Sequence, residues 1–171
     1  MGAKRRLPTV YLDTSILSAL HYKGGSFHGV YRATVTREWW EGERGNFRLY
    51  TSLLTLDELS AGRYNGQEAA VAAARRLPFL AWTKDVDARA QACLDAGLVP
   101  EGKAPDAIQL AFAVVYAVDY LLTWNHAHLA NPQVQARLQE MTGRLGLRTP
   151  WVVTPDSIPK AAWGQTIRRK D

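Results

Sequence analysis

The stretch that most constrains the fold lies near the start of the chain, where an apolar, β-prone run ends in a single carboxylate. Val10, Tyr11 and Leu12 precede Asp13, and after two hydroxyl residues an apolar, helix-like stretch follows at residues 16–20. This order predicts a strand, a carboxylate at its C-terminal end, and then a helix. In an open α/β sheet, ligands bind outside the carboxyl ends of the strands. We therefore expect Asp13 to lie at a ligand-binding edge.

The rest of the chain repeats this alternation of short apolar runs and longer helix-like segments, separated by Gly, Pro and Asn. We expect further strands at residues 49–53, 79–82, 120–123 and 151–154, and further helices at residues 30–43, 55–61, 67–77, 84–96, 105–118 and 132–144. Strands that alternate with helices of about 10–15 residues predict a mostly parallel sheet with helices on both faces. The expected fold is an α/β, three-layer architecture with about five strands.

The composition is that of one globular domain. A chain of 171 residues with 47% hydrophobic and 22% charged residues is long enough to bury a sizeable core. No apolar run approaches the roughly 18 residues of a membrane span, and no signal-peptide core follows the basic start. The single cysteine, Cys93, agrees with a reducing compartment. We expect a cytoplasmic protein with no membrane partner.

The formal net charge of +5 suggests an anionic partner such as nucleic acid, but the basic excess lies at the two ends. Without residues 4–6 and 168–171, the remaining chain is formally neutral. We expect residues 1–171 to form a single domain in which residues 1–8 and about 156–171 are basic, flexible tails. Such tails serve either solubility or contact with phosphates.

Three carboxylates occupy comparable positions relative to the expected strands. Asp13 follows the first strand, Glu58 lies in the helix after the second, and Asp106 begins the apolar helix that precedes the fourth. Segments that leave the carboxyl ends of parallel strands share one edge, so these acids can meet. Clustered carboxylates repel one another and need a cation, and hard oxygen ligands select Mg²⁺ or Mn²⁺. Such a site suits phosphoryl chemistry, because a bound metal activates water and neutralises charge on a phosphate oxygen.

Each of these acids also has a purely structural explanation. Asp13 can cap the helix that it precedes. Thr55 and Glu58 have the spacing of a capping box, and Asp106, beside Pro105, can interact with a helix dipole. The joint placement of the three acids, rather than any one of them, favours a site.

Other chemistries lack their sequence motifs. The four histidines and the single cysteine show no zinc-ligand spacing, and no dinucleotide, Walker A or serine-hydrolase motif occurs. The six tryptophans are expected to pack in the core. Trp124 is a partial exception, because it follows the fourth expected strand and could stack on a base. The Trp39-Trp40 pair is explained equally well by burial and by contact with a partner.

Four segments spread over most of the chain carry a family resemblance. They are residues 10–17 (VYLDTSIL), 51–59 (TSLLTLDEL), 104–111 (APDAIQLA) and 119–131 (DYLLTWNHAHLAN). In this order they resemble the PIN-domain nucleases, and among them the VapC-type toxins of prokaryotic toxin–antitoxin pairs. The resemblance implies a PIN-like sheet of about five strands and RNA cleavage by water that Mg²⁺ or Mn²⁺ activates. It also implies a homodimer and a small cognate antitoxin that covers the acidic pocket.

The resemblance also implies roles for particular residues. By position, Asp13, Glu58 and Asp106 match the metal-binding acids of the family, and Ser15 and Thr123 match hydroxyl positions beside that pocket.

One departure concerns a fourth acid that many members carry shortly after the fourth strand, where this sequence has Asn125. Asparagine can offer a neutral oxygen or orient a water, but it removes one negative charge, so a second metal should bind more weakly. Asp119 is a poor substitute because it begins the strand instead of following it. Asp57 lies about 100° around the helix axis from Glu58 and should point elsewhere.

The leading hypothesis is a metal-dependent endoribonuclease with Asp13, Glu58, Asp106 and Asn125 as catalytic residues, acting as the toxin of a toxin–antitoxin pair. One alternative is a PIN-like module that binds RNA or a protein without cleaving, which the neutral Asn125 and the neutral body of the chain suggest. A housekeeping RNA-processing nuclease is a further alternative that the sequence does not separate from a toxin.

Overall fold

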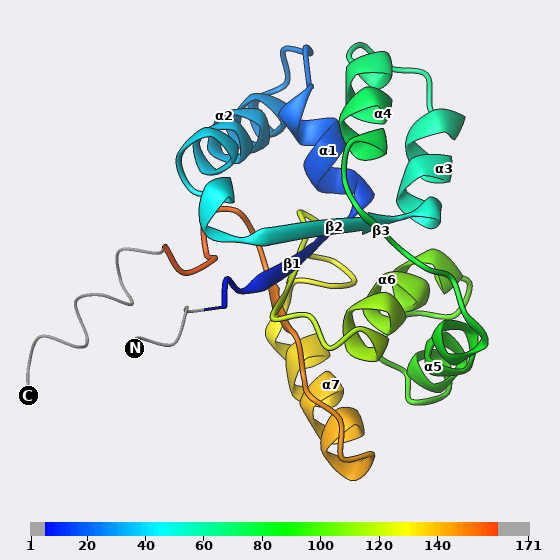
Figure 1. Ribbon diagram of the computed structural model, residues 1–171. Coiled ribbons are helices and arrows are strands. Elements are labelled where there is room, and N and C mark those ends of the chain that lie inside the picture. The colour runs from blue at the N-terminus through cyan, green and yellow to red at the C-terminus, as the bar shows by residue number, and fades with distance from the viewer. Residues whose placement is uncertain (1–5, 161–171) are drawn as a thin grey trace, which may run out of the picture.

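The computed structural model describes residues 6–160, and its centre is a five-stranded sheet in which every pairing is parallel (Figure 1). The strands are β1 (Thr9–Leu12), β2 (Arg48–Ser52), β3 (Phe79–Leu80), β4 (Tyr120–Leu122) and β5 (Trp151–Val153). Their order in the sheet is β3-β2-β1-β4-β5. The chain therefore runs outward from β1 on one side, and then returns to place β4 on the other side. The boundary between β1 and β4 is therefore the topological switch point, and ligands bind at the carboxyl ends of the strands there in such sheets.

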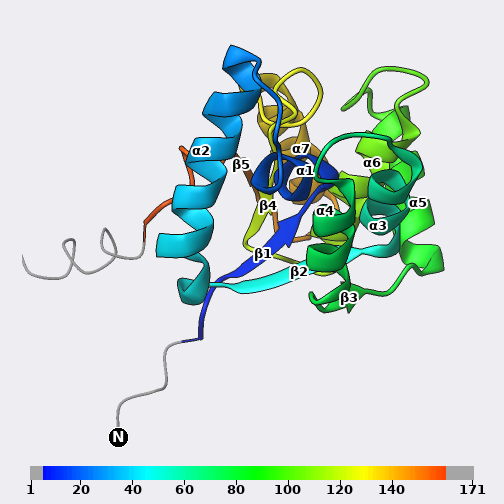
Figure 2. The ribbon, with the colours of Figure 1, turned by 90° about the horizontal axis from the view of Figure 1, so that it is seen from above.

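Helices cover both faces of the sheet, which confirms the expected α/β architecture with three layers. They are α1 (Thr14–Leu20), α2 (Phe27–Gly42), the 3-10 helix η1 (Arg44–Asn46), α3 (Leu53–Ala61), α4 (Gln67–Arg75), α5 (Lys84–Asp95), α6 (Ala104–Val115) and α7 (Pro132–Arg144). Figure 1 shows α1 to α4 on one side of the sheet and α5 to α7 on the other. In the view from above, α1 lies between α2 and α4, and it packs against both (Figure 2).

Alternation along β1 divides the core into two parts. Tyr11 faces α5, α6 and α7, whereas Val10 and Leu12 face α1, α2 and α4. All three side chains are fully buried, as expected for a central parallel strand with helices on both faces. Asp13 thus follows a strand whose position is fixed from both sides.

Helix α3 begins earlier than the sequence indicated, and its start corrects one expectation. Ser52 ends β2 in an extended conformation, and its hydroxyl accepts a hydrogen bond from the backbone N–H of Thr55. Thr55 is therefore inside the helix and cannot be its N-cap. The capping-box explanation of Glu58 is wrong, because that spacing falls within α3 and not at its start.

The tryptophan pair of α2 splits between the core and the surface. Trp39 is 4% exposed and packs against Phe47, with 5.9 Å between ring centroids. Trp40 is half-buried, and the guanidinium of Arg44 lies over its ring at 4.8 Å. Burial therefore accounts for Trp39.

The predicted tails lie mostly outside the described residues, because residues 1–5 and 161–171 are not among them. The expected start of the C-terminal tail, at about residue 156, is too early. Ile158 is 4% exposed in the core beneath α1 and α2, and the Ser157 hydroxyl accepts a hydrogen bond from the backbone N–H of Thr154. Among the described helices, none is long and apolar enough to cross a membrane.

Candidate active site

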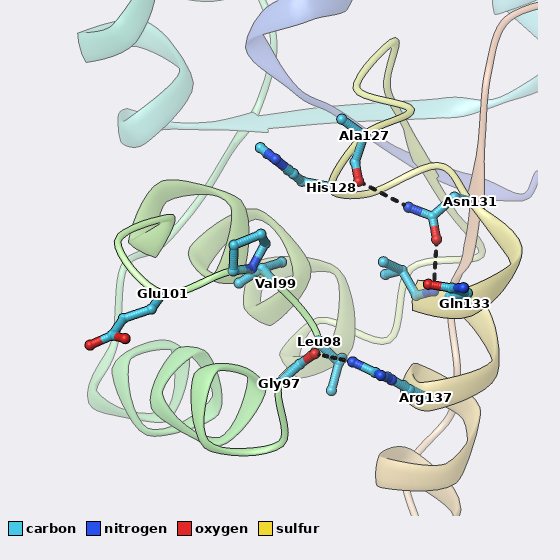
Figure 3. A pocket seen from close by; sticks show the side chains of 11 residues that line it. Gly97, Leu98, Val99, Glu101, Ala127, His128, Asn131, Gln133 and Arg137 are labelled. Carbon is cyan, nitrogen blue, oxygen red and sulfur yellow. Dashed lines mark hydrogen bonds between the residues drawn. The ribbon is translucent and has the colours of Figure 1, made fainter.

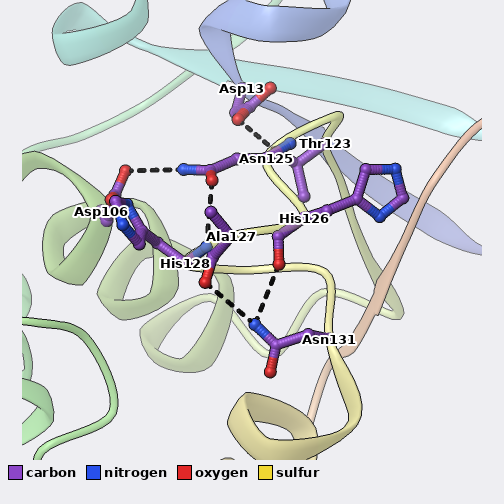
Figure 4. Close-up of polar contacts among 8 residues, drawn as sticks. All are labelled: Asp13, Asp106, Thr123, Asn125, His126, Ala127, His128 and Asn131. Atoms are coloured by element: carbon purple, nitrogen blue, oxygen red, sulfur yellow. Dashed lines mark hydrogen bonds and ion pairs between the residues drawn. The ribbon is translucent and has the colours of Figure 1, made fainter.

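The carboxyl ends of β1 and β4 bring Asp13 and Thr123 side by side at the switch point. The Thr123 hydroxyl donates to Asp13 Oδ2 at 2.6 Å (Figure 4). Asp13 Oδ1 accepts from the backbone N–H and from the hydroxyl of Ser15, at 3.0 and 2.5 Å. Asp13 therefore caps α1. This capping role does not exclude a role in a site, because one side chain can serve both.

Ser15 also connects α1 to the segment that follows β4, because its hydroxyl accepts from the backbone N–H of Trp124 at 2.8 Å. The indole of Trp124 is 2% exposed and donates from Nε1 to the Thr36 hydroxyl at 2.8 Å. Packing therefore accounts for Trp124, as expected for the tryptophans in general, and because α2 covers its ring, the alternative of stacking on a base does not fit this structure. Ser15 and Thr123 both lie against Asp13, as the sequence predicted.

Asp13 is a buried carboxylate without a counter-charge. It is 5% exposed, and none of the ion pairs among the described residues includes it. Burial raises the pKa of Asp13 to about 6, and the hydrogen bonds from Ser15 and Thr123 offset only part of that effect. A buried charge held only by neutral donors is costly, so this position would gain from a bound cation.

Glu58 reaches the same edge from α3. Its Oε2 accepts from the Thr14 hydroxyl and from Gln109 Nε2, the latter at 3.3 Å. Gln109 lies on α6 and is 3% exposed, and its Oε1 accepts from the Tyr11 hydroxyl at 2.5 Å. Two helices therefore hold Glu58, while the neighbouring Asp57 is exposed. The sequence analysis did not predict a role for Gln109 at this edge. A single amide in an otherwise apolar helix could have indicated one.

Asp106 lies in the first turn of α6 and is held from the loop that follows β4 (Figure 4). Asn125 Nδ2 donates to Asp106 Oδ1 at 3.1 Å, and His128 Nδ1 donates to Asp106 Oδ2 at 2.9 Å. Asn125 Oδ1 in turn accepts from the backbone N–H of His128 at 3.1 Å. Asn125 thus lies beside Asp106, but both ends of its amide are already engaged. Sequence reasoning considered His128 only as a zinc ligand and missed its contact with Asp106.

Hydrogen bonds link two of the three acids, Asp13 and Asp106, whereas Glu58 is held by a separate set of partners. The backbone N–H of Asn125 donates to the Thr123 hydroxyl at 2.9 Å, which connects Asp13 to Asp106. Thr14, next to Asp13 in sequence, connects α1 to Glu58. Within the described part of the chain, however, no three His, Cys, Asp or Glu side chains form a group that could hold one metal ion. Coordination of a single ion by all three acids therefore stays a prediction.

The donors at this edge fit a hard divalent cation bound by fewer protein ligands. Mg²⁺ is typically held by one or two carboxylates and keeps several waters. Asp13 offers a desolvated carboxylate that lacks a counter-charge. Asp106 is connected to it through Thr123 and Asn125, and Glu58 is hydrogen-bonded to Thr14, the residue that follows Asp13 in the sequence. Protein oxygens, with no thiolate among them, are the ligands that suit Mg²⁺ or Mn²⁺.

No family model matches the chain, and no curated protein sequence matches it. Among solved structures, the chain is similar to VapC20 of Mycobacterium tuberculosis, a toxin described as cleaving the sarcin-ricin loop. The TM-score is 0.55 at 22% identity, over 70% of this chain and 92% of the toxin. A second similar structure is VapBC-1 from nontypeable Haemophilus influenzae, with a TM-score of 0.49 at 17% identity, over 87% of this chain and 99% of the other. The likeness to VapC20 shows a shared fold, and the predicted PIN-like fold is confirmed.

Proposed function

We propose that this chain is a metal-dependent endoribonuclease that cleaves RNA with a water molecule activated by Mg²⁺ or Mn²⁺. One observation carries the proposal: Asp13 is a buried carboxylate at the switch point of the sheet, and only neutral donors contact it. Asp106 is connected to Asp13 through Thr123 and Asn125, and Glu58 is hydrogen-bonded to Thr14, which follows Asp13 in the sequence. The fold shared with VapC20, which is described as a toxin that cleaves the sarcin-ricin loop, favours RNA as the substrate.

The chain's own residues supply ligands, orientation and a proton acceptor. Asp13, with Glu58 or Asp106, would hold the metal ion, which when bound lowers the pKa of water and neutralises phosphate charge. Ser15 and Thr123 fix the rotamer of Asp13 through three hydrogen bonds. These bonds pre-organise the carboxylate, so that it does not reorient during the reaction.

Glu58 is suited to accept the proton of the attacking water. Its Oε2 is held by Thr14 and Gln109, which leaves Oε1 without a hydrogen bond from any described side chain. In the hydrolysis, the water oxygen bonds to phosphorus, the bond from phosphorus to the leaving ribose oxygen breaks, and the water proton passes to Oε1. The leaving oxygen takes a proton from solvent, so the products are a phosphate end and a hydroxyl end.

We further propose that the protein is the toxin of a toxin–antitoxin pair, that it acts in the cytoplasm as a homodimer, and that a small cognate antitoxin covers the acidic edge. The shared fold with a toxin supports this assignment. Expression of the chain alone should arrest growth, and co-expression of the product of an adjacent small gene should relieve the arrest. Normal growth with cleavage-competent protein would favour a housekeeping nuclease.

The alternative of a module that binds RNA without cleaving it has its own support. Asn125 stands where a fourth acid would add charge, and both ends of its amide are engaged with Asp106 and His128. This alternative predicts RNA binding that EDTA does not change, with no products in the presence of either metal.

Cleavage of labelled single-stranded and structured RNA by the purified protein, in Mg²⁺, Mn²⁺ or EDTA, tests the proposed function. Glu58→Gln is the inactive variant, and Asp57→Asn, which removes the neighbouring exposed carboxylate, is its matched control. We expect cleavage that requires metal, that is lost in Glu58→Gln and that persists in Asp57→Asn. Undiminished cleavage in EDTA, or equal activity in both variants, would contradict the proposal.

A further inference from the structure

A hollow lies beside the loop that follows β4 (Figure 3). It is lined by residues 97–101, which connect α5 to α6, by the loop around Ala127 and His128, and by the first turns of α7. Its volume is about 440 Å³, within the range of about 300–1,000 Å³ that is typical of sites for small molecules. We call it the α7 pocket.

His128 is shared between this pocket and the acidic edge. Its Nδ1 donates to Asp106 at 2.9 Å, and its side chain lines the α7 pocket. A molecule that occupies the pocket would therefore lie one side chain away from an acid of the proposed cleavage site. For a polymeric substrate, this places the pocket beside the reacting phosphate.

The floor of the α7 pocket is apolar and the rim is polar. Leu98, Val99 and Val134 are 4%, 4% and 6% exposed, so they close the bottom of the pocket and offer a ligand only a small apolar contact. Gln133 and Arg137 are exposed at the rim.

Arg137 is the cation of this rim, and no carboxylate neutralises it. Its Nη1 donates to the carbonyl of Gly97 at 2.5 Å, and no ion pair among the described residues includes it. Arg144, two turns later on α7, is instead paired with Glu140. Glu101 is the acid among the lining residues, and Figure 3 shows its carboxylate pointing away from the pocket. A guanidinium with free N–H groups is well suited to phosphate.

We propose that the α7 pocket binds the RNA nucleotide next to the scissile phosphate, with its base in the pocket beside Gln133 and its phosphate on Arg137. This inference rests on the proposed function, because the acidic edge defines where the scissile phosphate lies. The exposed amide of Gln133 is placed to read the edge of the base. The pocket would thus contribute both affinity and sequence preference.

Binding of a fluorescent single-stranded RNA in EDTA tests the pocket separately from cleavage. Arg137→Gln should weaken binding about five- to tenfold, as expected for one charge-assisted contact. It should also reduce the slope of log affinity against log salt by about one. Arg144→Gln is the matched control, because it removes the same charge from the same helix outside the pocket, and it should change affinity less than about twofold.

A second variant tests the pocket without removing the hydrogen bond between Arg137 and Gly97, whose loss could disturb the fold. Ala127 is exposed and lines the pocket, so Ala127→Trp should fill it and weaken RNA binding at least as much, with an unchanged melting temperature. Wild-type affinity in both pocket variants, an equal loss in Arg144→Gln, or no RNA binding by the wild type would overturn the proposal.

The two proposals fail in different ways. If no metal supports cleavage but both pocket variants still lose RNA binding, the nuclease assignment fails, and the α7 pocket stands as an RNA-binding site that has no place beside a scissile phosphate. If cleavage requires metal but KM is unchanged in both pocket variants, the pocket assignment fails and the nuclease assignment stands.

Discussion

Two aspartates at opposite ends of neighbouring strands differ in whether a cation of the protein neutralises them. Asp13 follows β1 at the carboxyl end of the sheet, and Asp119 precedes β4 at the amino end. Asp119 Oδ2 accepts from the backbone N–H and the hydroxyl of Thr9, at 2.7 and 2.8 Å, and its Oδ1 accepts from Arg148. Both acids therefore have several donors, but only Asp119 has a cation.

The pKa values of the two acids move in opposite directions. Partial burial raises the pKa of Asp119, but the hydrogen bonds from Thr9 and the guanidinium of Arg148 outweigh burial and hold the pKa below its usual value. Burial raises the pKa of Asp13 to about 6, and its neutral donors do not reverse that shift. Arg148 thus neutralises Asp119, whereas no cationic side chain among the described residues is paired with Asp13. A buried carboxylate with a raised pKa and no cationic partner is a candidate for binding a cation.

The largest expected effect is the loss of cleavage in Asp13→Asn. Removing a metal-binding carboxylate should lower kcat by about a thousandfold, because the ion supplies several kcal/mol of stabilisation to the transition state. Asp119→Asn removes a comparable acid from the other end of the sheet and should leave kcat within about twofold. Single-turnover cleavage with saturating Mn²⁺ compares the two variants, and equal losses in both would contradict the comparison.

The next effect is a pH dependence of stability in metal-free protein. Folded protein binds the Asp13 proton more tightly than unfolded protein does, with a pKa of about 6 against 3.8. Between these two values the folded state holds more protons, so the contribution of Asp13 to the free energy of unfolding falls as the pH rises from about 4 to about 6. The loss is on the order of 3 kcal/mol.

Urea unfolding in EDTA at pH 4 and pH 7.5 measures this dependence, with Asp13→Asn as the reference. Relative to that variant, the wild type should be less stable at pH 7.5 than at pH 4. A difference between the two proteins that does not change with pH would show that Asp13 carries no such cost.

A smaller effect, on metal affinity, is expected when the hydrogen bond from His128 to Asp106 is removed. His128→Ala removes the donor to Asp106 Oδ2, and partners that orient a metal ligand are typically worth about 10- to 100-fold in metal affinity or activity. His126→Ala is the control, because His126 is exposed and Figure 4 shows its ring turned away from Asp106. Calorimetric titration with Mn²⁺ should show weaker binding in His128→Ala only, and equal affinities would remove His128 from this role.

The smallest effect concerns the amino end of the sheet. Asp119→Asn keeps an acceptor for Thr9 but loses the ion pair with Arg148, whose side chain is 55% exposed. We expect a loss of about 1–2 kcal/mol in the free energy of unfolding at pH 7.5. Urea unfolding checks this value, and wild-type stability in the variant would show that the ion pair is not structural.

The sequence placed Asp13 correctly because it follows a strand of a parallel sheet, whereas Thr123, expected to end the fourth strand, was placed beside Asp13 by the family resemblance. Any residue that directly follows such a strand must lie at the carboxyl edge, whatever the packing around it. Helix α7 was found at its observed bounds, residues 132–144, because Asn131 and Pro132 mark its start. The positions of Asp13 and α7 follow from local rules and from topology.

Other features depend on packing that local patterns do not carry. His128 contacts Asp106 only because of the path taken by the loop after β4, and Gln109 contacts Glu58 across 51 residues of sequence. Trp124 is covered by α2, which no strand-end rule predicts. The start of α3 was missed because Ser52 and Thr55 are both good N-cap residues, and the end of β2 selects the first of them.

Calorimetric titration of the metal-free protein with Mn²⁺ at pH 7.5 tests most directly whether the two ends of the sheet differ as described. The wild type and Asp119→Asn should bind Mn²⁺ with similar affinity, and Asp13→Asn should show no binding heat while keeping its fold by circular dichroism. Binding by Asp13→Asn with wild-type affinity, or no binding by any of the three proteins, would contradict the assignment of the carboxyl edge as a cation site.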